Sequence, residues 1–254
     1  MIDVDAVESE ANVELGARDA VEWLRGLASE SIDLLITDPP YESLEKHRAV
    51  GTTTRLKVSA ASSNPWFTVF PNARFGELFT EVFRVLKKNS HFYLMCDQET
   101  AFVAKPIAES AGFKFWKPLV WDKCTIGMGY HYRARYEFVL FFEKGKRKLN
   151  DLGIADVITA PRIRGGYPAE KPVALSETLI LQSSGASDVV ADPFMGSGSV
   201  GVAALKLSRR FLGNDVSETA LAHARTRFAE VGGHEGPVLT SDAPGQRRLS
   251  LVLP

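Results

Sequence analysis

The chain has 254 residues, a formal net charge of −1 at pH 7 and a hydrophobic fraction of 45%. This length predicts a single domain with a core that needs no disulfide or metal for its stability. The two cysteines, Cys96 and Cys124, form no disulfide or metal-binding pattern, so we expect no metal site and a reducing, cytoplasmic compartment. No run of about 18 apolar residues is present to span a membrane. The near-neutral charge lacks the basic excess that nucleic-acid binding usually leaves in a sequence.

Predicted helices and strands alternate along most of the chain. In chain order, apolar periodicity predicts a helix over 18–28, a strand over 32–37, a helix over 73–88, a strand over 91–96, a helix over 99–110, strands over 113–121 and 136–142, a helix over 171–183, a strand over 188–191, a helix over 198–208, a strand over 210–213 and a helix over 217–231. This order predicts an α/β fold with a doubly wound, mainly parallel sheet. Such sheets bind ligands at the carboxyl ends of their strands.

Three stretches lack such a pattern, although we assign all of 1–254 to one domain with its core at about 12–231. Residues 42–72 have no clear period and predict a mobile inserted segment. Residues 145–167 are polar and basic, and residues 232–254 are rich in Gly, Pro and Ser, which predicts a loose tail.

A glycine-rich turn follows one of the predicted strands in the sequence VVADPFMGSGSVG, residues 189–201. Gly196 and Gly198 predict a backbone that a ligand can approach closely, and Asp215 after the next strand can accept hydrogen bonds from a ribose. Asp192 would repel a pyrophosphate but suits a cationic ligand, such as the sulfonium and ammonium groups of S-adenosylmethionine. We therefore expect a nucleoside-containing cofactor; the alternative is a tight turn with no ligand.

A second motif, Asp38-Pro39-Pro40-Tyr41, ends another predicted strand. Consecutive prolines keep this backbone extended, so the Asp38 carboxylate and the Pro39 carbonyl can both accept hydrogen bonds from one donor. Tyr41 adds an aromatic face. The motif predicts a site for the exocyclic amino group of a planar base.

Together these motifs resemble those of the DNA amino-methyltransferases, which modify adenine N6 or cytosine N4. Because the Asp-Pro-Pro-Tyr motif comes first, the order is similar to that of the circularly permuted beta group. Three more segments are similar to this family: 17–24, 121–145 and 167–180. The sequence departs from the family pattern at Arg18, Tyr167 and Asp215. The resemblance implies a doubly wound, Rossmann-like methyltransferase sheet of seven strands, one of them antiparallel.

The resemblance also implies a reaction and a set of site residues. The reaction is direct methyl transfer from S-adenosylmethionine to a base flipped out of double-stranded DNA at a short recognition site. Asp38, rather than Ser, favours adenine N6 over cytosine N4. The implied catalytic residues are Asp38, Pro39, Pro40 and Tyr41, and the implied cofactor-binding residues are Asp19, Lys171, Asp192, Pro193, Phe194, Gly196, Ser197, Gly198 and Asp215. A homodimer and a cognate restriction nuclease are the further partners that such a protein suggests.

Basic residues are concentrated in two segments, although the net charge of the whole chain is near zero. Segments 42–75 and 143–171 each carry a local charge excess of +3 and would face DNA in this family. The candidate DNA-binding residues are Arg55, Lys57, Arg133, Arg135, Arg162 and Arg164. Arg133 and Arg135 have an alternative role as partners of Glu137 or Asp122. Residues 145–167 are the candidate recognition segment.

Other functions fit the same sequence less well. A cytosine-N4 DNA methyltransferase or an RNA methyltransferase could use the same motifs, and a non-catalytic nucleic-acid-binding subunit is a third alternative. Methylation of cytosine C5 needs a cysteine nucleophile, typically after a proline, and neither Cys96 nor Cys124 has that context. A small-molecule oxidoreductase on a Rossmann-type sheet would leave the Asp-Pro-Pro-Tyr motif without a role.

Overall fold

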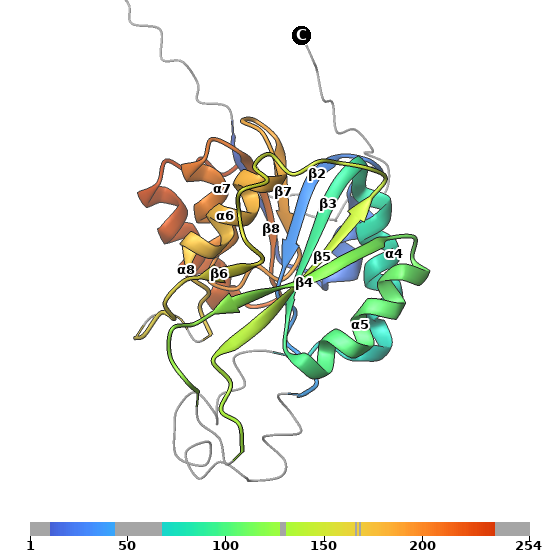
Figure 1. Ribbon diagram of the computed structural model, residues 1–254. Coiled ribbons are helices and arrows are strands. Elements are labelled where there is room, and N and C mark those ends of the chain that lie inside the picture. Colours follow the sequence, from blue (N-terminus) through green and yellow to red (C-terminus); the bar gives the residue numbers. More distant parts are fainter. Residues whose placement is uncertain (1–10, 44–67, 128–130, 166, 168, 237–254) are drawn as a thin grey trace, which may run out of the picture.

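The computed structural model describes residues 11–43, 68–127, 131–165, 167 and 169–236. One eight-stranded sheet runs through the molecule in the order β1-β8-β7-β2-β3-β5-β4-β6 (Figure 1). The strands are β1 (Val13–Gly16), β2 (Ile32–Thr37), β3 (Leu86–Cys96), β4 (Lys114–Asp122), β5 (Tyr136–Lys144), β6 (Val157–Thr159), β7 (Val189–Asp192) and β8 (Arg210–Asn214). Among these strands, β5 alone runs antiparallel to its neighbours β3 and β4. The predicted mainly parallel sheet with one antiparallel strand is confirmed.

The expected strand number of seven is wrong by one, because the described sheet has eight strands. Two short strands escaped the sequence pattern: β1 has four residues and β6 has three. A strand this short is detectable from sequence when it is a continuous apolar run before a turn motif, as in the four-residue β7. The sequence VELG of β1 and the three-residue β6 offer no such run. The strand β6 lies within the candidate recognition segment 145–167 and pairs with β4 at the edge of the sheet.

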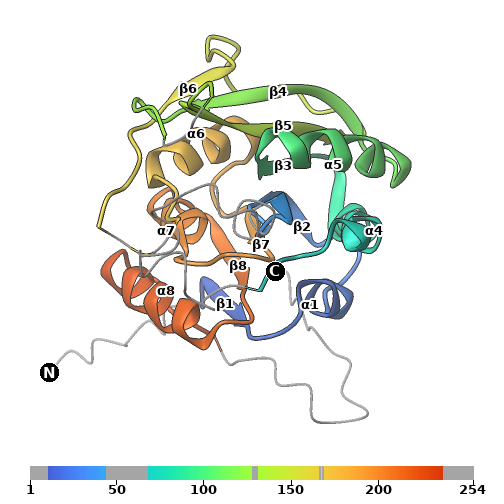
Figure 2. The same cartoon turned by 90° about the horizontal axis from the view of Figure 1, so that it is seen from below.

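Helices cover both faces of the sheet, as a doubly wound fold requires (Figure 2). The helices α1 (Ala20–Gly26), α4 (Phe75–Val85) and α5 (Gln98–Ser110) lie on one face, and α6 (Val173–Ser183), α7 (Ser199–Lys206) and α8 (Glu218–Glu230) lie on the other. A short 3-10 helix, Asn72–Arg74, precedes α4. The predicted helix over 73–88 ends earlier, at Val85, because Leu86 is extended and begins β3.

Each face of the sheet has its own apolar core. On the α4 side, the stacked rings of Phe75 and Phe79 are 5.2 Å apart and fully buried. On the α8 side, Phe211 of β8 meets Phe228 edge to face at 5.5 Å. No helix among the described residues is long and apolar enough to cross a membrane.

Two segments that we expected to be loose are partly fixed. Residues 232–236 lie alongside β1. The Asn12 N–H donates to the His234 carbonyl at 3.0 Å, and Val13 forms a β-bridge with Glu235. The expected loose tail is therefore wrong for these residues, and residues 237–254 lie outside the described residues. At the end of segment 42–72, the Phe70 N–H donates to the Pro40 carbonyl at 2.8 Å. The ring of Phe70 is buried, so this end of the segment is part of the core.

Candidate active site

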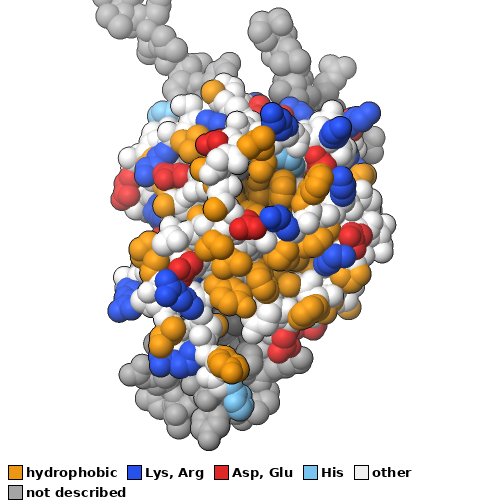
Figure 3. Space-filling model, in the orientation of Figure 1, with side chains coloured by type: hydrophobic (Ala, Val, Ile, Leu, Met, Phe, Trp, Pro, Cys, Tyr) orange, Lys and Arg blue, Asp and Glu red, His pale blue; other side chains and the backbone are white. Residues whose placement is uncertain are grey.

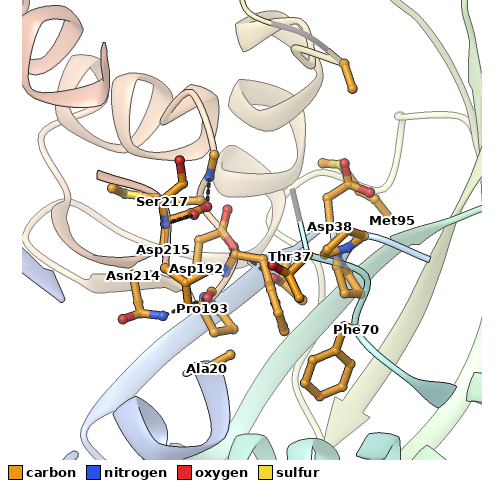
Figure 4. A pocket seen from close by; sticks show the side chains of 18 of the residues that line it. Ala20, Thr37, Asp38, Phe70, Met95, Asp192, Pro193, Asn214, Asp215 and Ser217 are labelled. Atoms are coloured by element: carbon orange, nitrogen blue, oxygen red, sulfur yellow. Dashed lines mark hydrogen bonds between the residues drawn. The ribbon is translucent and has the colours of Figure 1, made fainter. Parts of the chain in front are cut away.

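A cavity of about 980 Å³ opens at the carboxyl ends of the central strands. Asp38 directly follows β2 and Asp192 ends β7, and these two parallel strands are hydrogen-bonded neighbours. The two sequence motifs, far apart along the chain, therefore meet in one cavity. Figure 4 shows Asp38 and Asp215 on opposite sides of the cavity, with Asp192 between them.

Most of the predicted site residues line this cavity. They are Asp19, Asp38, Pro39, Pro40, Tyr41, Lys171, Asp192, Pro193, Phe194, Gly196, Ser197 and Asp215. Gly198 is not among the lining residues. Its φ is +76°, and a Cβ placed there would lie 2.7 Å from the Phe228 ring. Close packing against Phe228 therefore leaves no room for a side chain at Gly198. At Gly196 (φ +49°), by contrast, a Cβ would have no atom within 4 Å and would border open space.

Asp38 is held by two side chains from different parts of the chain. Its Oδ1 accepts a hydrogen bond from the Tyr41 hydroxyl, and its Oδ2 accepts one from the Lys171 ammonium. Lys171 Nζ also lies 3.7 Å from Glu137 Oε2, on β5. Burial raises the pKa of the Asp38 carboxyl, while the positive charge of Lys171 acts in the opposite direction. We expected Lys171 at the cofactor; the structure places its ammonium on the carboxylate of the Asp-Pro-Pro-Tyr motif.

Asp192 is more deeply buried and has neutral partners. Its Oδ1 accepts hydrogen bonds from the Thr37 hydroxyl at 2.8 Å and from the Phe194 N–H at 3.0 Å. Within the described part of the chain, no cationic side chain forms an ion pair with it. Burial therefore raises the pKa of Asp192 to about 7. The site holds a desolvated carboxylate that a cationic ligand would stabilise.

Asp215 ties the end of β8 to the glycine-rich turn. Its Oδ2 accepts a hydrogen bond from the Gly196 N–H at 3.0 Å, and its Oδ1 accepts one from the Ser217 N–H at 2.8 Å. Burial raises the pKa of this carboxyl as well. A carboxylate has about four acceptor positions, so Asp215 keeps capacity for a ligand hydroxyl.

Asp19 has an internal partner that the sequence did not reveal. Its carboxylate caps α1 and accepts two hydrogen bonds from the Arg74 guanidinium, at 2.7 and 2.8 Å. The guanidinium lowers the pKa of Asp19 and lies 5.1 Å from the centre of the Phe70 ring. Arg74 and Phe70 both line the cavity. Phe70 lies at the end of the aperiodic segment 42–72, and Arg74 lies near the start of the helix predicted over 73–88. Arg74 was counted only within the basic segment 42–75, so no pattern marked either residue as part of the cavity.

Glu137 is the other important residue that sequence reasoning did not place in the site. It lies on β5 near the cavity and pairs with Lys123 at 3.1 Å as well as with Lys171. The available signal was its position in the Trp-x-Lys and Glu-Phe strand pair that the family resemblance includes. We considered it only as a partner for the nearby arginines.

The candidate DNA-binding residues that the structure describes, Arg133, Arg135, Arg162 and Arg164, are not among the residues that line the cavity. Arg135 forms a two-bond ion pair with Asp122, at 2.7 Å for each bond, which is the alternative role that the sequence suggested. Arg133 Nε donates to the Gly127 carbonyl at 2.8 Å. Arg162 and Arg164 are exposed. Arg55 and Lys57 lie outside the described residues, so DNA contact stays a prediction for all six.

A second cavity, of about 410 Å³, lies between α6 and the strands β4, β5 and β6. Its lining is mainly apolar. Apolar side chains also gather over the middle of the face of the molecule that Figure 3 shows. The charged residues in the lining, Lys117 and Asp156, pair with each other at 2.8 Å. Nor do the described residues contain a group of three or more His, Cys, Asp or Glu side chains placed to hold a metal. The 980 Å³ cavity is therefore the candidate active site.

Comparisons with known proteins agree with this geometry. The N6_N4_Mtase family, described as DNA methylase, matches residues 32–161 and 150–226, which is more than half of the chain. The chain is 25% identical over 238 residues to the type II methyltransferase M.HpaI of Haemophilus parainfluenzae, covering 83% of this chain and 72% of that protein. It is 26% identical over 256 residues to the DNA adenine methyltransferase YhdJ of Escherichia coli, covering 85% and 82% respectively.

Solved structures show the same fold. The crystal structure of the M1.HpyAVI–SAM complex has a TM-score of 0.62 and 23% identity, and the match covers 85% of this chain and 98% of that one. The PvuII DNA methyltransferase, titled cytosine-N4-specific, has a TM-score of 0.68 and 15% identity, covering 90% and 97%.

Proposed function

This chain belongs to the DNA methylase family N6_N4_Mtase, and from that premise we propose that it transfers the methyl group of S-adenosylmethionine to adenine N6 in double-stranded DNA. The observation that carries the proposal is the meeting of Asp38 and Asp192 in one cavity, at the ends of adjacent parallel strands. One carboxylate suits the amino group of the target base, and the other suits the cation of the methyl donor.

The cavity fits the proposed cofactor. S-Adenosylmethionine supplies an electrophilic methyl group on a sulfonium, and it also carries an ammonium. The buried Asp192 carboxylate has no cationic partner among the described residues, so a cationic ligand would offset its desolvation. Asp215 and the open backbone at Gly196 lie beside it. The residues we propose to hold the cofactor are Asp19, Asp192, Pro193, Phe194, Gly196, Ser197 and Asp215.

The Asp-Pro-Pro-Tyr corner supplies the groups that the amino nitrogen needs. A base inside a duplex is out of reach, so the target adenine must be flipped into the cavity. Asp38 and the Pro39 carbonyl would accept its two N–H bonds, and Tyr41 would stack on its ring. These hydrogen bonds direct the nitrogen lone pair at the methyl group. The N–C bond would form as the S–C bond breaks, and Asp38 would accept the proton that the nitrogen then loses.

Several finer features belong to the same proposal. Asp38 at the first motif position favours adenine, and the name of the relative YhdJ supports this choice. The similarity to the cytosine-N4-specific PvuII enzyme makes cytosine N4 the second candidate. The motif order supports the circularly permuted beta group. Recognition would rest on segments 42–72 and 145–167, and a homodimer and a cognate nuclease remain proposed partners.

Nucleoside mass spectrometry tests the proposal directly. Purified protein is incubated with unmethylated genomic DNA and S-adenosylmethionine, and the DNA is then digested to nucleosides. We expect N6-methyladenine, and sequencing that detects modified bases will give the recognition site. N4-methylcytosine alone would overturn the choice of adenine. Product on RNA but not on DNA would move the substrate to RNA, and no product on either would contradict the enzymatic function.

A further inference from the structure

Four charged side chains from four parts of the chain alternate in sign along a series of contacts that ends at Asp38. Lys123 Nζ lies 3.1 Å from Glu137 Oε1, and Lys171 Nζ lies 3.7 Å from Glu137 Oε2 and bonds Asp38 Oδ2. The Tyr41 hydroxyl donates to the other oxygen of Asp38. The side chains of Lys123 and Lys171 are only 15% and 13% exposed. Buried ammonium groups of this kind need carboxylate partners, and here two cations meet two anions.

The surroundings of Lys171 fix its ammonium at this place. The buried Trp121 ring lies 5.9 Å from Lys171 Nζ, and its indole N–H donates to the Ala160 carbonyl at 2.8 Å. Pro172 follows immediately and is the N-cap residue of α6. The lysine stem is thereby directed across the cavity from the α6 side of the sheet to the end of β2.

Lys171 is the cation that faces Asp38 within the described residues. The other titratable groups near Asp38 are Tyr41, Glu137 of β5, Asp192 of β7 and the Cys96 thiol of β3. None of these four favours the ionised form of Asp38 by its charge: Glu137 and Asp192 oppose it, and burial opposes it further. Without Lys171, Asp38 would become protonated more readily and would lose capacity to accept hydrogen bonds.

We propose that Lys171, anchored by Glu137, is a positioning residue for methyl transfer: its ammonium keeps Asp38 ionised and turned into the cavity as the acceptor of the target amino group. The carboxylate has enough lone pairs to keep the bonds from Lys171 and Tyr41 and still accept an N–H from the base. The identity of the target as an amino group rests on the proposed function above, whereas the charge arrangement around Asp38 does not depend on any substrate.

The pH profile of methyl transfer tests the role of Lys171. In Lys171→Gln we expect the acid limb of kcat to move upward by about 1 to 3 pH units, because a neighbouring cation lowers a carboxyl pKa by that amount. KM for S-adenosylmethionine should change little, and Lys171→Arg should restore most of the profile. The matched control is Lys105→Gln, which removes the exposed ion pair with Glu109. A raised KM with an unmoved acid limb would overturn the proposal and return Lys171 to cofactor binding.

A direct titration separates this inference from the proposed function. Carboxyl ¹³C NMR of protein labelled at aspartate, with Asp38→Asn for assignment, reports the ionisation of Asp38 without any DNA. We expect the Asp38 signal to titrate at higher pH in Lys171→Gln than in the natural protein. An unchanged titration would overturn the inference even in an active enzyme. If the enzyme methylated no nucleic acid, a shifted titration would still support the charge arrangement.

A double-mutant cycle tests the anchor. Glu137→Gln should lower kcat, because Lys171 loses one of its two carboxylate partners. If Glu137 acts through Lys171, the double variant Lys171→Gln/Glu137→Gln should be no slower than Lys171→Gln alone. Fully additive losses would show that Glu137 acts independently and would overturn its part in the proposal.

Discussion

Asp38 and Asp192 occupy equivalent places in the fold but have opposite electrostatic surroundings. Both lie at the carboxyl ends of adjacent parallel strands, both line the same cavity, and burial raises the pKa of both carboxyls. Asp38 bonds the ammonium of Lys171, whereas the partners of Asp192 among the described residues are the hydroxyl of Thr37 and a backbone N–H. One carboxylate thus carries its own counter-charge, and the other is prepared for a counter-charge brought by a ligand. Position in the sheet sets where a carboxylate points, and its partners decide what it can bind.

The largest expected effect comes from removing Asp38. In Asp38→Ala the target amino group loses its charged acceptor, and we expect kcat to fall by about a thousandfold or more. Cofactor binding, measured by isothermal titration calorimetry, should stay close to normal because Asp192 is untouched. Glu109→Ala, at an exposed ion pair with Lys105, is the control. Near-normal turnover of Asp38→Ala would refute the acceptor role.

Asp192→Asn should weaken cofactor binding, the property that Asp38→Ala leaves close to normal. The amide keeps the size of the side chain but not its charge, so Kd for S-adenosylmethionine should rise by about 10- to 100-fold. The folded protein should be no less stable at pH 8, since a desolvated charge has been removed. Equilibrium binding and thermal unfolding measure the two quantities. An unchanged Kd would mean that Asp192 does not face the cationic part of the cofactor.

The pH dependence of cofactor binding sharpens the same contrast. Asp192 has a pKa of about 7 in the folded protein, against an ordinary value of 3.8. If binding needs the ionised carboxylate, apparent affinity should rise by about tenfold between pH 6 and pH 8, following the ionised fraction. Binding at pH 6 should also release a proton, which calorimetry in buffers of different ionisation enthalpy detects. A flat profile, or the same profile in Asp192→Asn, would contradict this assignment.

The free energy of unfolding should change with pH in the direction opposite to the cofactor affinity, falling where the affinity rises. Since the folded pKa of Asp192 is raised, the folded state binds more protons than the unfolded state between about pH 4 and pH 7. The contribution of Asp192 to the free energy of unfolding therefore declines as pH rises through that window. Urea unfolding at pH 5 and pH 8 should show this decline in the natural protein and a smaller one in Asp192→Asn.

The smallest expected effect comes from Thr37→Val. This change preserves shape but removes the 2.8 Å hydrogen bond to Asp192 Oδ1. Because that bond lowers the pKa of Asp192, its loss should raise the pKa further and weaken cofactor binding at pH 7 by about two- to fivefold. At pH 9 the difference from the natural protein should narrow. A difference that persists undiminished at pH 9 would place the effect of Thr37 outside the ionisation of Asp192.

The parts of the site that were predictable share a local origin. The Asp-Pro-Pro-Tyr corner and the glycine-rich turn each depend on consecutive residues, so their shape follows from proline and glycine chemistry in the sequence itself. Arg74 and Glu137 were not predicted as site residues, because each acts on a carboxylate distant in the sequence: Arg74 on Asp19, and Glu137 on the ammonium that bonds Asp38. The close packing at Gly198 was not predictable for the same reason, since the Phe228 ring that excludes a side chain comes from α8.

By itself, the sequence determined the alternation of strands and helices, the two strand-end motifs and their resemblance to DNA amino-methyltransferases. These features are local, because periodicity, turn chemistry and short motifs need no knowledge of distant neighbours. The tertiary structure alone decided that the strands before Asp38 and Asp192 are adjacent, that Lys171 bonds Asp38, and that Asp192 has no cation among the described residues. Charge pairing and desolvation depend on distances of a few ångströms between segments far apart in the chain, and only the folded protein sets those distances.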